Sequence, residues 1–400
     1  MTRYEEHKYI RERRRKQLLL EIEDMIMDFL ENIYNLGNLK FKILNVKKWQ
    51  NYRFFEGILK NAPDNLQYRY TAFLLLRSRN RFSIILYLLT RIYNLLVSGI
   101  TCTTREIYYN NSELCGSQKR LQSVIWDVCT MLNSSSLDIG IISPTKGLIA
   151  GCLTLFLNNH NIIDFKTNYG ATLLPYNFFE VEYLQTDAKF VLVVEKYTVF
   201  EKFLALKIFE NIGSEMILVT GKGFPDVSTR LIVNRLGCHH GLPVYILVDA
   251  NPYGIEIMCV YRFGSRGMAH MAKCLTCPHA RWLGIHPSEL SVLTIPTLPL
   301  TYLDKMKLEE LATRPYLCQN IRRELKISLN ILRKAEIDNV FNISSNFLIY
   351  DYISNKINRH LSLYHIFFSR LIFKRIFRTH RTNSSNRTCI CYFTGHHGGC

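Results

Sequence analysis

Apolar and charged residues alternate along the amino-terminal segment with the period of an α-helix. Residues 1–34 are therefore expected to form a charged amphipathic helix. A basic run from Arg11 to Lys16 lies within it and is typical of a solvated face. The apolar stripe could equally dock onto a partner protein. This stripe comprises Leu18, Ile22, Met25, Phe29 and Leu30.

A longer helical pattern covers residues 68–98 and carries Arg77, Arg79 and Arg81. Gly99 follows in the position of a C-cap, so the helix is expected to end there. The longest apolar stretch of the chain, residues 82–100, is interrupted by Arg91. It is better interpreted as a core helix than as a membrane span.

Two shorter helices and an alternating segment follow. Thr103 or Thr104 offers an N-cap for a helix that holds Tyr108 and Tyr109, and residues 118–132 have apolar positions at helical spacing. Residues 137–157 then alternate like a small β-hairpin. Two helices and a β wing predict a winged helix-turn-helix (CAP-like) domain, which presents one helix to a DNA groove.

The pattern changes in the second half of the chain, where short apolar runs alternate with helical segments. A β-α-β-α-β order of this kind predicts a Rossmann-like α/β domain with a parallel sheet and right-handed crossovers. The expected strands are residues 189–194, 216–219 and 244–248, and the expected helices are residues 200–209 and 226–236.

Each expected strand ends in polar residues. Glu195 follows the first strand, Gly-Lys-Gly at 221–223 follows the second, and Asp249 and Asn251 follow the third. Ligands of such sheets bind beyond the carboxyl ends of the strands. Two carboxylates and an amide oxygen suit Mg²⁺, which prefers hard oxygen ligands. An isolated Asp-x-Asn would more often cap a strand end, but the combination of three strand ends favours a site.

The composition of the chain indicates a polyanionic binding partner. The 50 Lys and Arg against 33 Asp and Glu give a formal charge of +17, which favours nucleic acid. The first residues lack the apolar core of a signal peptide, so an intracellular protein is expected.

The 12 cysteines show no dense framework of spacings, so reduced thiols are expected rather than a disulfide scaffold. Two Cys/His clusters are weak candidates for zinc, because structural zinc sites usually draw two separated ligand pairs. The first contains His270, Cys274, Cys277 and His279, and the second contains Cys389, Cys391, His396, His397 and Cys400.

Seven motifs now carry a family resemblance. They are TTREIYYNN (103–111), SPTKGLIAG (143–151), VLVVEK (191–196), VTGKGFPDVSTRL (219–231), LVDANPYGIEIM (247–258), RWLGIHPSEL (281–290) and TRPY (313–316). The chain resembles the topoisomerase VI A-subunit family, and within it most closely the meiotic double-strand-break protein, Spo-eleven. The likeness covers roughly residues 68–355.

The resemblance implies four domains. These are an N-terminal helical partner-binding extension (1–66), a winged-helix DNA-binding domain with the nucleophilic tyrosine (67–165), a metal-binding Toprim domain (180–355) and a divergent basic tail (356–400). The tail pattern suits a basic amphipathic helix or an unfolded segment, and DNA affinity is a more natural role for it than membrane binding.

The resemblance also implies residue roles. Tyr109 matches the attacking tyrosine, Arg105 lies one helical turn before it and can stabilise the phenolate or clamp the scissile phosphate, and Lys146 matches a DNA-contacting lysine. The metal triad that would hold Mg²⁺ corresponds to Glu195, Asp249 and Asn251.

The expected activity is a type II, Mg²⁺-dependent DNA transesterase of the nucleus that initiates meiotic recombination. The tyrosine of one protomer is expected to work with the metal site of the other, so that a homodimer breaks double-stranded DNA and leaves 5′-phosphotyrosyl ends. A B-type partner with an ATPase- or transducer-like element and accessory meiotic proteins are implied, whereas a membrane is not.

One departure from the family pattern keeps alternatives open. Asn251 stands where members of the family carry a second Asp, and an amide oxygen brings no charge to a metal. The chain could therefore be a catalytically weakened DNA-binding subunit. The metal motif alone would also fit a Toprim nuclease that uses water in place of tyrosine.

Overall fold

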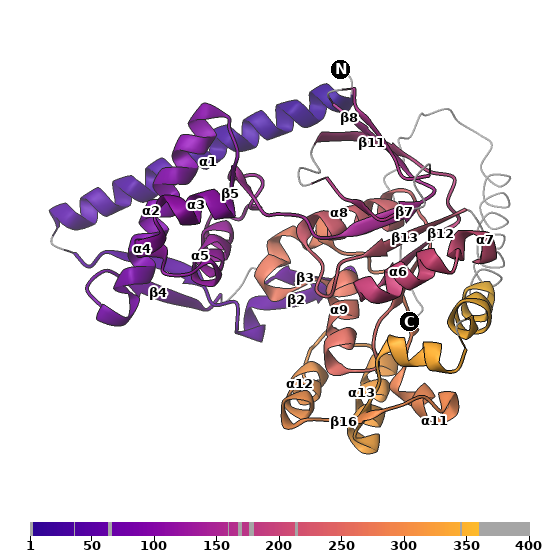
Figure 1. Cartoon of the computed structure of the whole chain (residues 1–400). Coiled ribbons are helices and arrows are strands. Elements are labelled where there is room, and N and C mark those ends of the chain that lie inside the picture. Colours follow the sequence, from indigo (N-terminus) through magenta and orange to yellow (C-terminus); the bar gives the residue numbers. More distant parts are fainter. Residues whose placement is uncertain are drawn as a thin grey trace, which may run out of the picture.

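The computed structural model describes residues 3–35, 37–62, 66–158, 160–166, 170–175, 180–212, 215–344 and 346–359. The chain forms two modules that lie side by side in Figure 1. We call them the helical module (residues 12–44 and 68–142) and the sheet module (residues 148–359). The second Cys/His cluster and nearly all of the basic tail lie outside the described residues.

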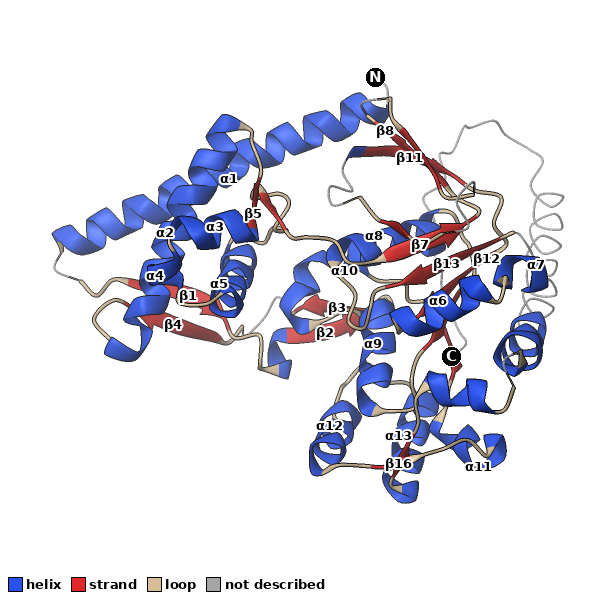
Figure 2. Ribbon diagram, viewed as in Figure 1, coloured by secondary structure: helices blue, strands red, loops and turns tan. Residues whose placement is uncertain are grey.

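Helices build most of the helical module, as Figure 2 shows. They are α1 (Arg3–Tyr34), α2 (Leu76–Ser98), α3 (Thr104–Asn110), α4 (Ser112–Cys115) and α5 (Gln118–Met131). Their apolar faces share one core, in which α2 alone buries eight residues. Helix α2 is long and apolar enough to cross a membrane, but here it is the central helix of a packed core, as its sequence predicts. Gly99 caps it in the left-handed conformation, and its N–H donates to Leu95 O.

The apolar stripe of α1 packs within this same module. Leu18 and Ile22 are buried against the core, and Met25 and Phe29 pack beside them. Arg15 donates to the carbonyl groups of Leu96 and Val97 at the end of α2, where a cation complements the helix dipole. The chain itself covers most of this stripe, so these four residues are not free to bind a partner, whereas Leu30 is exposed.

The helical pattern over residues 68–98 contains a strand that was not predicted. Strand β4 (Tyr68–Ala72) pairs antiparallel with β1 (Lys40–Leu44), and α2 begins only at Leu76. The Tyr-Arg-Tyr-Thr sequence favours a strand because aromatic and β-branched residues suit a pleated surface. The 1–66 segment is thus only partly helical. Its hairpin β2 (Tyr52–Phe55) and β3 (Ile58–Asn61) packs Tyr52 and Leu59 into the core of the sheet module.

A six-stranded mixed sheet organises the sheet module, with the order β10-β7-β13-β12-β14-β15. Strands β12 (Phe190–Val194), β13 (Met216–Thr220), β14 (Val244–Leu247) and β15 (Arg281–Gly284) are parallel. All residues of β12, β13 and β14 are buried, as expected of strands covered on both faces. The predicted parallel sheet is confirmed.

Helices cover the faces of this sheet (Figure 1). The connections between its central strands are α6 (Tyr197–Ala205) with α7 (Ile208–Ile212), and α8 (Val227–Asn234), which continues as the π-helical η3 (Arg235–His239). Helix α9 (Pro252–Phe263) follows β14. The carboxy-terminal part adds η4 (Arg266–Met271), α10 (Ala272–Leu275), η5 (Pro287–Glu289), α11 (Leu290–Leu293), β16 (Leu298–Pro299), α12 (Tyr302–Ala312), α13 (Gln319–Ile331), β17 (Arg333–Lys334), η6 (Ile337–Asn342) and η7 (Leu348–Ile353).

The predicted wing hairpin is wrong in its pairing. Strand β6 (Ile141–Ile142) pairs in parallel with β5 (Cys102–Thr103) inside the helical module. Strand β7 (Leu148–Gly151) instead joins the large sheet between β13 and β10 (Thr172–Leu173). Strands β8 (Thr154–Leu157), β9 (Ile162–Asp164) and β11 (Val181–Gln185) form a separate small sheet. The segment from 148 to 165 thus belongs to the sheet module, because the buried Leu-Ile-Ala-Gly run extends a buried sheet.

Candidate active site

Helix α3 presents Tyr109 to solvent. Thr103 caps the helix and forms a capping box with Glu106. The N-cap predicted at this point is confirmed. Ile107 is fully buried and fixes the inner face of α3, while the side chain of Tyr109 is 70% exposed. Arg105 is also exposed and lies four residues before Tyr109, a spacing that places both on one side of the helix. Tyr108 packs partly against the core, with its ring 5.5 Å from that of Tyr109.

The two carboxylates of the candidate metal site meet at the carboxyl ends of β12 and β14. Glu195 and Asp249 retain only 8% and 2% of their exposure, and Glu195 Oε2 accepts a hydrogen bond of 2.8 Å from the backbone N–H of Asp249. Gly223, in the turn after β13, donates its N–H to Glu195 O at 2.8 Å. The predicted convergence of the three strand ends is therefore present.

Gly254 explains how these groups come so close. A Cβ atom at this position would lie 2.5 Å from Asp249 O and 2.9 Å from Glu195 Oε2. Real Cβ atoms do not approach so closely, so only glycine allows the first turn of α9 to pack against both acidic residues. The glycine of the Asp-x-Asn-Pro-x-Gly motif thus shapes the cluster.

Burial dominates the electrostatics of the pair. Burial is the largest effect on the pKa values of both side chains. Together with the neighbouring charge of Asp249, it raises the pKa of Glu195 to about 8. Burial also raises the pKa of Asp249, although the N–H of Ile337 and the ammonium of Lys196 oppose the shift. Two desolvated carboxylates are more stable with a bound proton or a bound cation than when both are ionised without one.

The side-chain amide of Asn251 is not oriented as a metal ligand would be. Its Oδ1 accepts a hydrogen bond of 2.8 Å from Gly254 N and caps helix α9, and its Nδ2 donates to Asp249 Oδ2 at 3.2 Å. The cap requires an acceptor, which fixes the orientation of the amide. The amide nitrogen therefore faces Asp249, and the expectation that the amide oxygen points at a metal does not fit this geometry.

Three further residues, which were not predicted, lie at this edge of the sheet. Lys196 forms ion pairs with Asp249, Glu336 and Asp338, at 3.0, 2.8 and 3.4 Å. The last two come from the start of η6, and Ala335 N donates to Ala250 O to bring this segment to the cluster. No spacing signal in the sequence links residues 140 positions apart, although Lys196 directly follows Glu195.

Lys146 lies at the same edge of the sheet, on the loop before β7. Its backbone N–H donates to Asp226 Oδ2 at 2.7 Å, and its Nζ donates to Lys222 O at 3.2 Å. Asp226 also caps α8 through Thr229 N. The side chain of Lys146 is exposed, so it adds positive charge near the metal cluster and lies against the sheet module.

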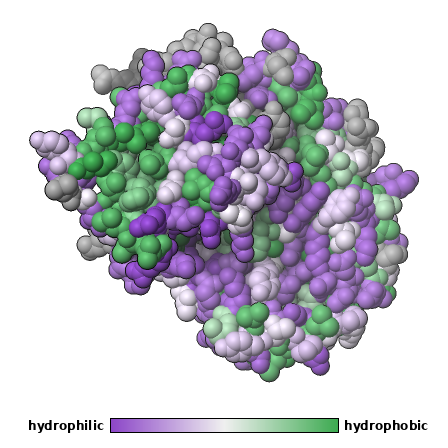
Figure 3. Space-filling view, turned by 60° about the vertical axis from the view of Figure 1, so that its left-hand side comes forward, coloured by the Kyte–Doolittle hydropathy of each residue, from purple (hydrophilic) through white to green (hydrophobic). Residues whose placement is uncertain are grey.

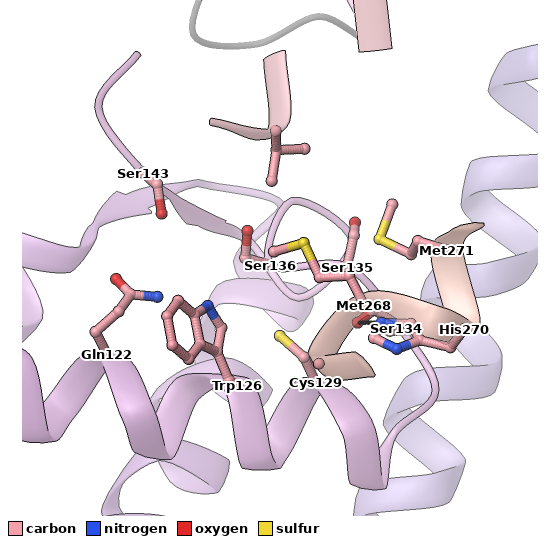
Figure 4. Close-up of a pocket in the computed structure, with 12 residues that line it drawn as sticks. Gln122, Trp126, Cys129, Ser134, Ser135, Ser136, Ser143, Met268, His270 and Met271 are labelled. Carbon is pink, nitrogen blue, oxygen red and sulfur yellow. Dashed lines mark hydrogen bonds between the residues drawn. The ribbon is translucent and has the colours of Figure 1, made fainter. Parts of the chain in front are cut away.

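The tyrosine helix and the carboxylate cluster lie in different parts of one chain. Helix α3 belongs to the helical module, whereas strands β12 and β14 lie within the sheet module (Figure 1). Between the modules is a small pocket, where Gln122, Trp126 and Cys129 of α5 face Met268 and His270 of η4 (Figure 4). None of the residues assigned to the tyrosine helix or to the carboxylate cluster lines this pocket, and within one chain helix α3 lies apart from β12 (Figure 1).

The cysteines give no support for zinc. The nine cysteines of the described part are free thiols. Among the described residues no group of three or more His, Cys, Asp and Glu side chains is arranged to hold a metal ion. His270 instead contacts Ser134 O at 3.1 Å.

Comparisons with known proteins identify the family. A family model for the Toprim domain of the topoisomerase 6 A-subunit and Spo11 matches residues 190–357, and a model described as type IIB DNA topoisomerase matches residues 80–141. The chain belongs to the topoisomerase VI A-subunit and Spo11 family, and residues 190–357 of its sheet module match the Toprim domain of that family.

Proteins named for meiotic recombination are among its relatives. The meiotic recombination protein W68 of Drosophila melanogaster is 41% identical over 309 residues, which are 77% of this chain and 92% of that protein. The human meiotic recombination protein SPO11 is 38% identical over 85% of this chain and 87% of its own length. The A3 form of the DNA topoisomerase 6 A-subunit of Oryza sativa is 32% identical over 68% of this chain and 62% of its own length.

A divalent cation fits the Glu195–Asp249 pair, as the Toprim fold suggests. The two carboxylates are buried, lie against a glycine that leaves them room, and already attract the ammonium of Lys196. Oxygen donors of this kind suit Mg²⁺. Glu195 and Asp249 would hold the ion, whereas Asn251 as oriented would support Asp249.

Proposed function

We propose that the chain is a DNA transesterase that breaks double-stranded DNA to initiate meiotic recombination in the nucleus, through a covalent 5′-phosphotyrosyl link at Tyr109. The observation that carries this proposal is an exposed tyrosine beside an arginine on one module and a buried carboxylate pair on the other. The names and similarity of the relatives support the meiotic role. Isolation of covalent protein–DNA complexes, followed by mass spectrometry of the DNA-linked peptide, tests it by locating the link at residue 109.

The chemistry exchanges one phosphodiester for another. The phenolic oxygen of Tyr109 forms a bond to the scissile phosphorus, the bond from phosphorus to the 3′-oxygen breaks, and the phenolic proton is released while the 3′-oxygen takes one up. Arg105 cannot accept that proton, but its guanidinium can pair with the phosphate and stabilise the phenolate. Mg²⁺, when bound, would neutralise charge on the phosphate and the leaving oxygen.

The separation of the two modules favours catalysis between protomers. In a homodimer, Tyr109 of one protomer would reach the phosphate held near Glu195 and Asp249 of the other, and two such sites would cut both strands. Lys146 and the turn at 221–223 line the same edge as the carboxylates, so their positive charge would bind the DNA backbone there.

A B-type partner is part of the proposal, and an outer stripe of α1 is the surface we assign to it. Leu20, Met27 and Tyr34 are 56–88% exposed, and their spacing places them opposite the buried Leu18 and Ile22. Figure 3 brings the helical module forward and shows apolar areas among hydrophilic ones on this face of the molecule.

Substitutions on the two sides of α1 are expected to have different effects. Leu18→Ala should lower the free energy of unfolding by about 2–5 kcal/mol, because a buried leucine leaves a cavity, whereas Leu20→Ala should change it by less than about 0.5 kcal/mol. Chemical denaturation measures both values. In co-purification with a B-type partner, Leu20→Glu should reduce recovery of the complex, and full recovery would contradict the assignment of the outer stripe.

A second candidate function is a DNA-binding subunit that no longer cleaves, and Asn251 is the observation that favours it. An amide at this position contributes no charge to an ion, and its nitrogen faces Asp249.

Asn251→Asp distinguishes the two functions. Aspartate can still cap α9, and its second oxygen would take the place of Nδ2 beside Asp249. We expect Mg²⁺ affinity to rise at least about tenfold, because a carboxylate replaces a neutral group. In the presence of a chelator, the metal-free variant should be less stable than the unaltered chain, because the new carboxylate repels that of Asp249. Calorimetric titration measures the affinity. Covalent adducts from the unaltered chain support the transesterase, whereas adducts that require Asn251→Asp support the weakened subunit.

A further inference from the structure

Lys196 places a protein cation directly against the candidate metal site. Its Nζ lies 3.0 Å from Asp249 Oδ2, 2.8 Å from Glu336 Oε2 and 3.4 Å from Asp338 Oδ2. The Asp249 side chain is 3% exposed, while those of Glu336 and Asp338 are 51% and 27% exposed. The ammonium thus joins a buried carboxylate to two that are open to solvent.

The two oxygens of Asp249 have separate partners. Oδ1 accepts a hydrogen bond of 2.8 Å from Ile337 N, which fixes the carboxylate. Oδ2 contacts Lys196 and Asn251. A metal ion that binds Asp249 through Oδ2 leaves the backbone hydrogen bond to Oδ1 intact, and there it meets the ammonium.

We propose that Lys196 is an internal counter-cation that competes with Mg²⁺ for Asp249 Oδ2 and withdraws to Glu336 and Asp338 when the ion binds. This inference rests on the proposed function, because it assumes that Glu195 and Asp249 form the metal site. Lys196 is a positioning residue in this scheme: it keeps the carboxylate cluster neutralised and in place until the metal arrives.

Glu336 and Asp338 give the displaced ammonium a place to go. A lysine side chain has a flexible four-carbon stem, so Lys196 can give up one of its three partners and remain ion-paired with two. Without them, release of Lys196 would leave an unpaired ammonium, which is costly in a partly buried position.

Metal titration of the full-length protein tests the competition without relying on cleavage. Lys196→Met should tighten Mg²⁺ binding at least about tenfold, since it removes a unit charge within about 4 Å of the ligand oxygen. Lys202→Met is the matched control: Lys202 pairs with Asp338 at 3.3 Å, and among the described residues it forms no ion pair with Asp249. It should change the dissociation constant less than about threefold, because its charge is more distant and screened.

A substitution that should weaken Mg²⁺ binding provides a second test, which stays informative if the Lys196→Met variant misfolds. Glu336→Gln alters a half-exposed side chain and weakens the resting place of Lys196, so Mg²⁺ should bind more weakly. In the Lys196→Met background the same change should have a smaller effect, because the two residues act as a coupled pair. Equal effects in both backgrounds, or equal tightening by Lys196→Met and Lys202→Met, would overturn the inference.

Asp249→Asn in the same titration separates this inference from the proposed function. If the unaltered chain and Asp249→Asn bind Mg²⁺ equally, the metal site itself is wrong and both proposals fail at that point. If Asp249→Asn loses binding while Lys196→Met matches the unaltered chain, the metal site stands and the competition by Lys196 is wrong.

Discussion

Tyr109→Phe is expected to abolish covalent protein–DNA adducts, lowering their yield by at least about 1000-fold, because phenylalanine has no oxygen that can attack phosphorus. The Tyr109 side chain is 70% exposed, so the loss of its hydroxyl should leave the free energy of unfolding nearly unchanged. Adducts are measured by denaturing purification of the protein and detection of attached DNA ends.

Tyr108→Phe is the matched control for this experiment. It removes the same hydroxyl from the neighbouring residue, whose ring packs partly against the core, and it should leave adduct formation close to normal. DNA cutting that persists in Tyr109→Phe would favour hydrolysis by water in the Toprim domain. Loss of adducts in Tyr108→Phe alone would move the nucleophile to that residue.

Glu195→Gln is expected to remove Mg²⁺ binding and adduct formation while preserving the fold. Glutamine retains an oxygen that can accept from the N–H of Asp249 and resembles the protonated glutamic acid, which the raised pKa favours in the metal-free protein. Adduct yield should fall at least about 100-fold, since an ion that stabilises the leaving oxygen would be lost. Glu182→Gln, on an exposed position of β11, should change neither property.

Glu195→Gln should also change how the free energy of unfolding depends on pH. Glu195 has a pKa of about 8 in the folded protein, above its ordinary value of 4.5, so the folded state holds a proton that the unfolded state releases. The resulting stabilisation is present at low pH and is lost as the pH rises from about 4.5 to about 8. In chelator, unfolding of the unaltered chain should therefore become easier over this range, and Glu195→Gln should remove that part of the slope. An unchanged slope would contradict the burial of Glu195.

The sequence predicts the sheet module well because its signals are local. Continuous apolar runs identify buried strands, and a polar residue directly after each run places Glu195 and Asp249 at one edge of the sheet. Thr103 and Gly99 are likewise recognisable because capping depends on one residue and its immediate neighbours.

Features that depend on distant pairing could not be predicted in this way. The partner of β4 lies at residues 40–44, and β7 joins the large sheet although the sequence around it resembles a hairpin. The ion pairs of Lys196 with Glu336 and Asp338 join residues 140 and more positions apart. The orientation of Asn251 needs the position of Gly254 N, because only the cap shows which amide atom faces Asp249.

The central claim is that Tyr109 of one protomer acts with the carboxylate pair of another. Its most direct measurement mixes a Tyr109→Phe chain with a Glu195→Gln chain of different mass, each inactive alone, under conditions in which protomers exchange. We expect the mixture to recover adducts, DNA to be joined only to the Glu195→Gln chain, and the breaks to be in one strand. A mixture as inactive as its separate components, although mixed dimers have formed, would contradict the claim.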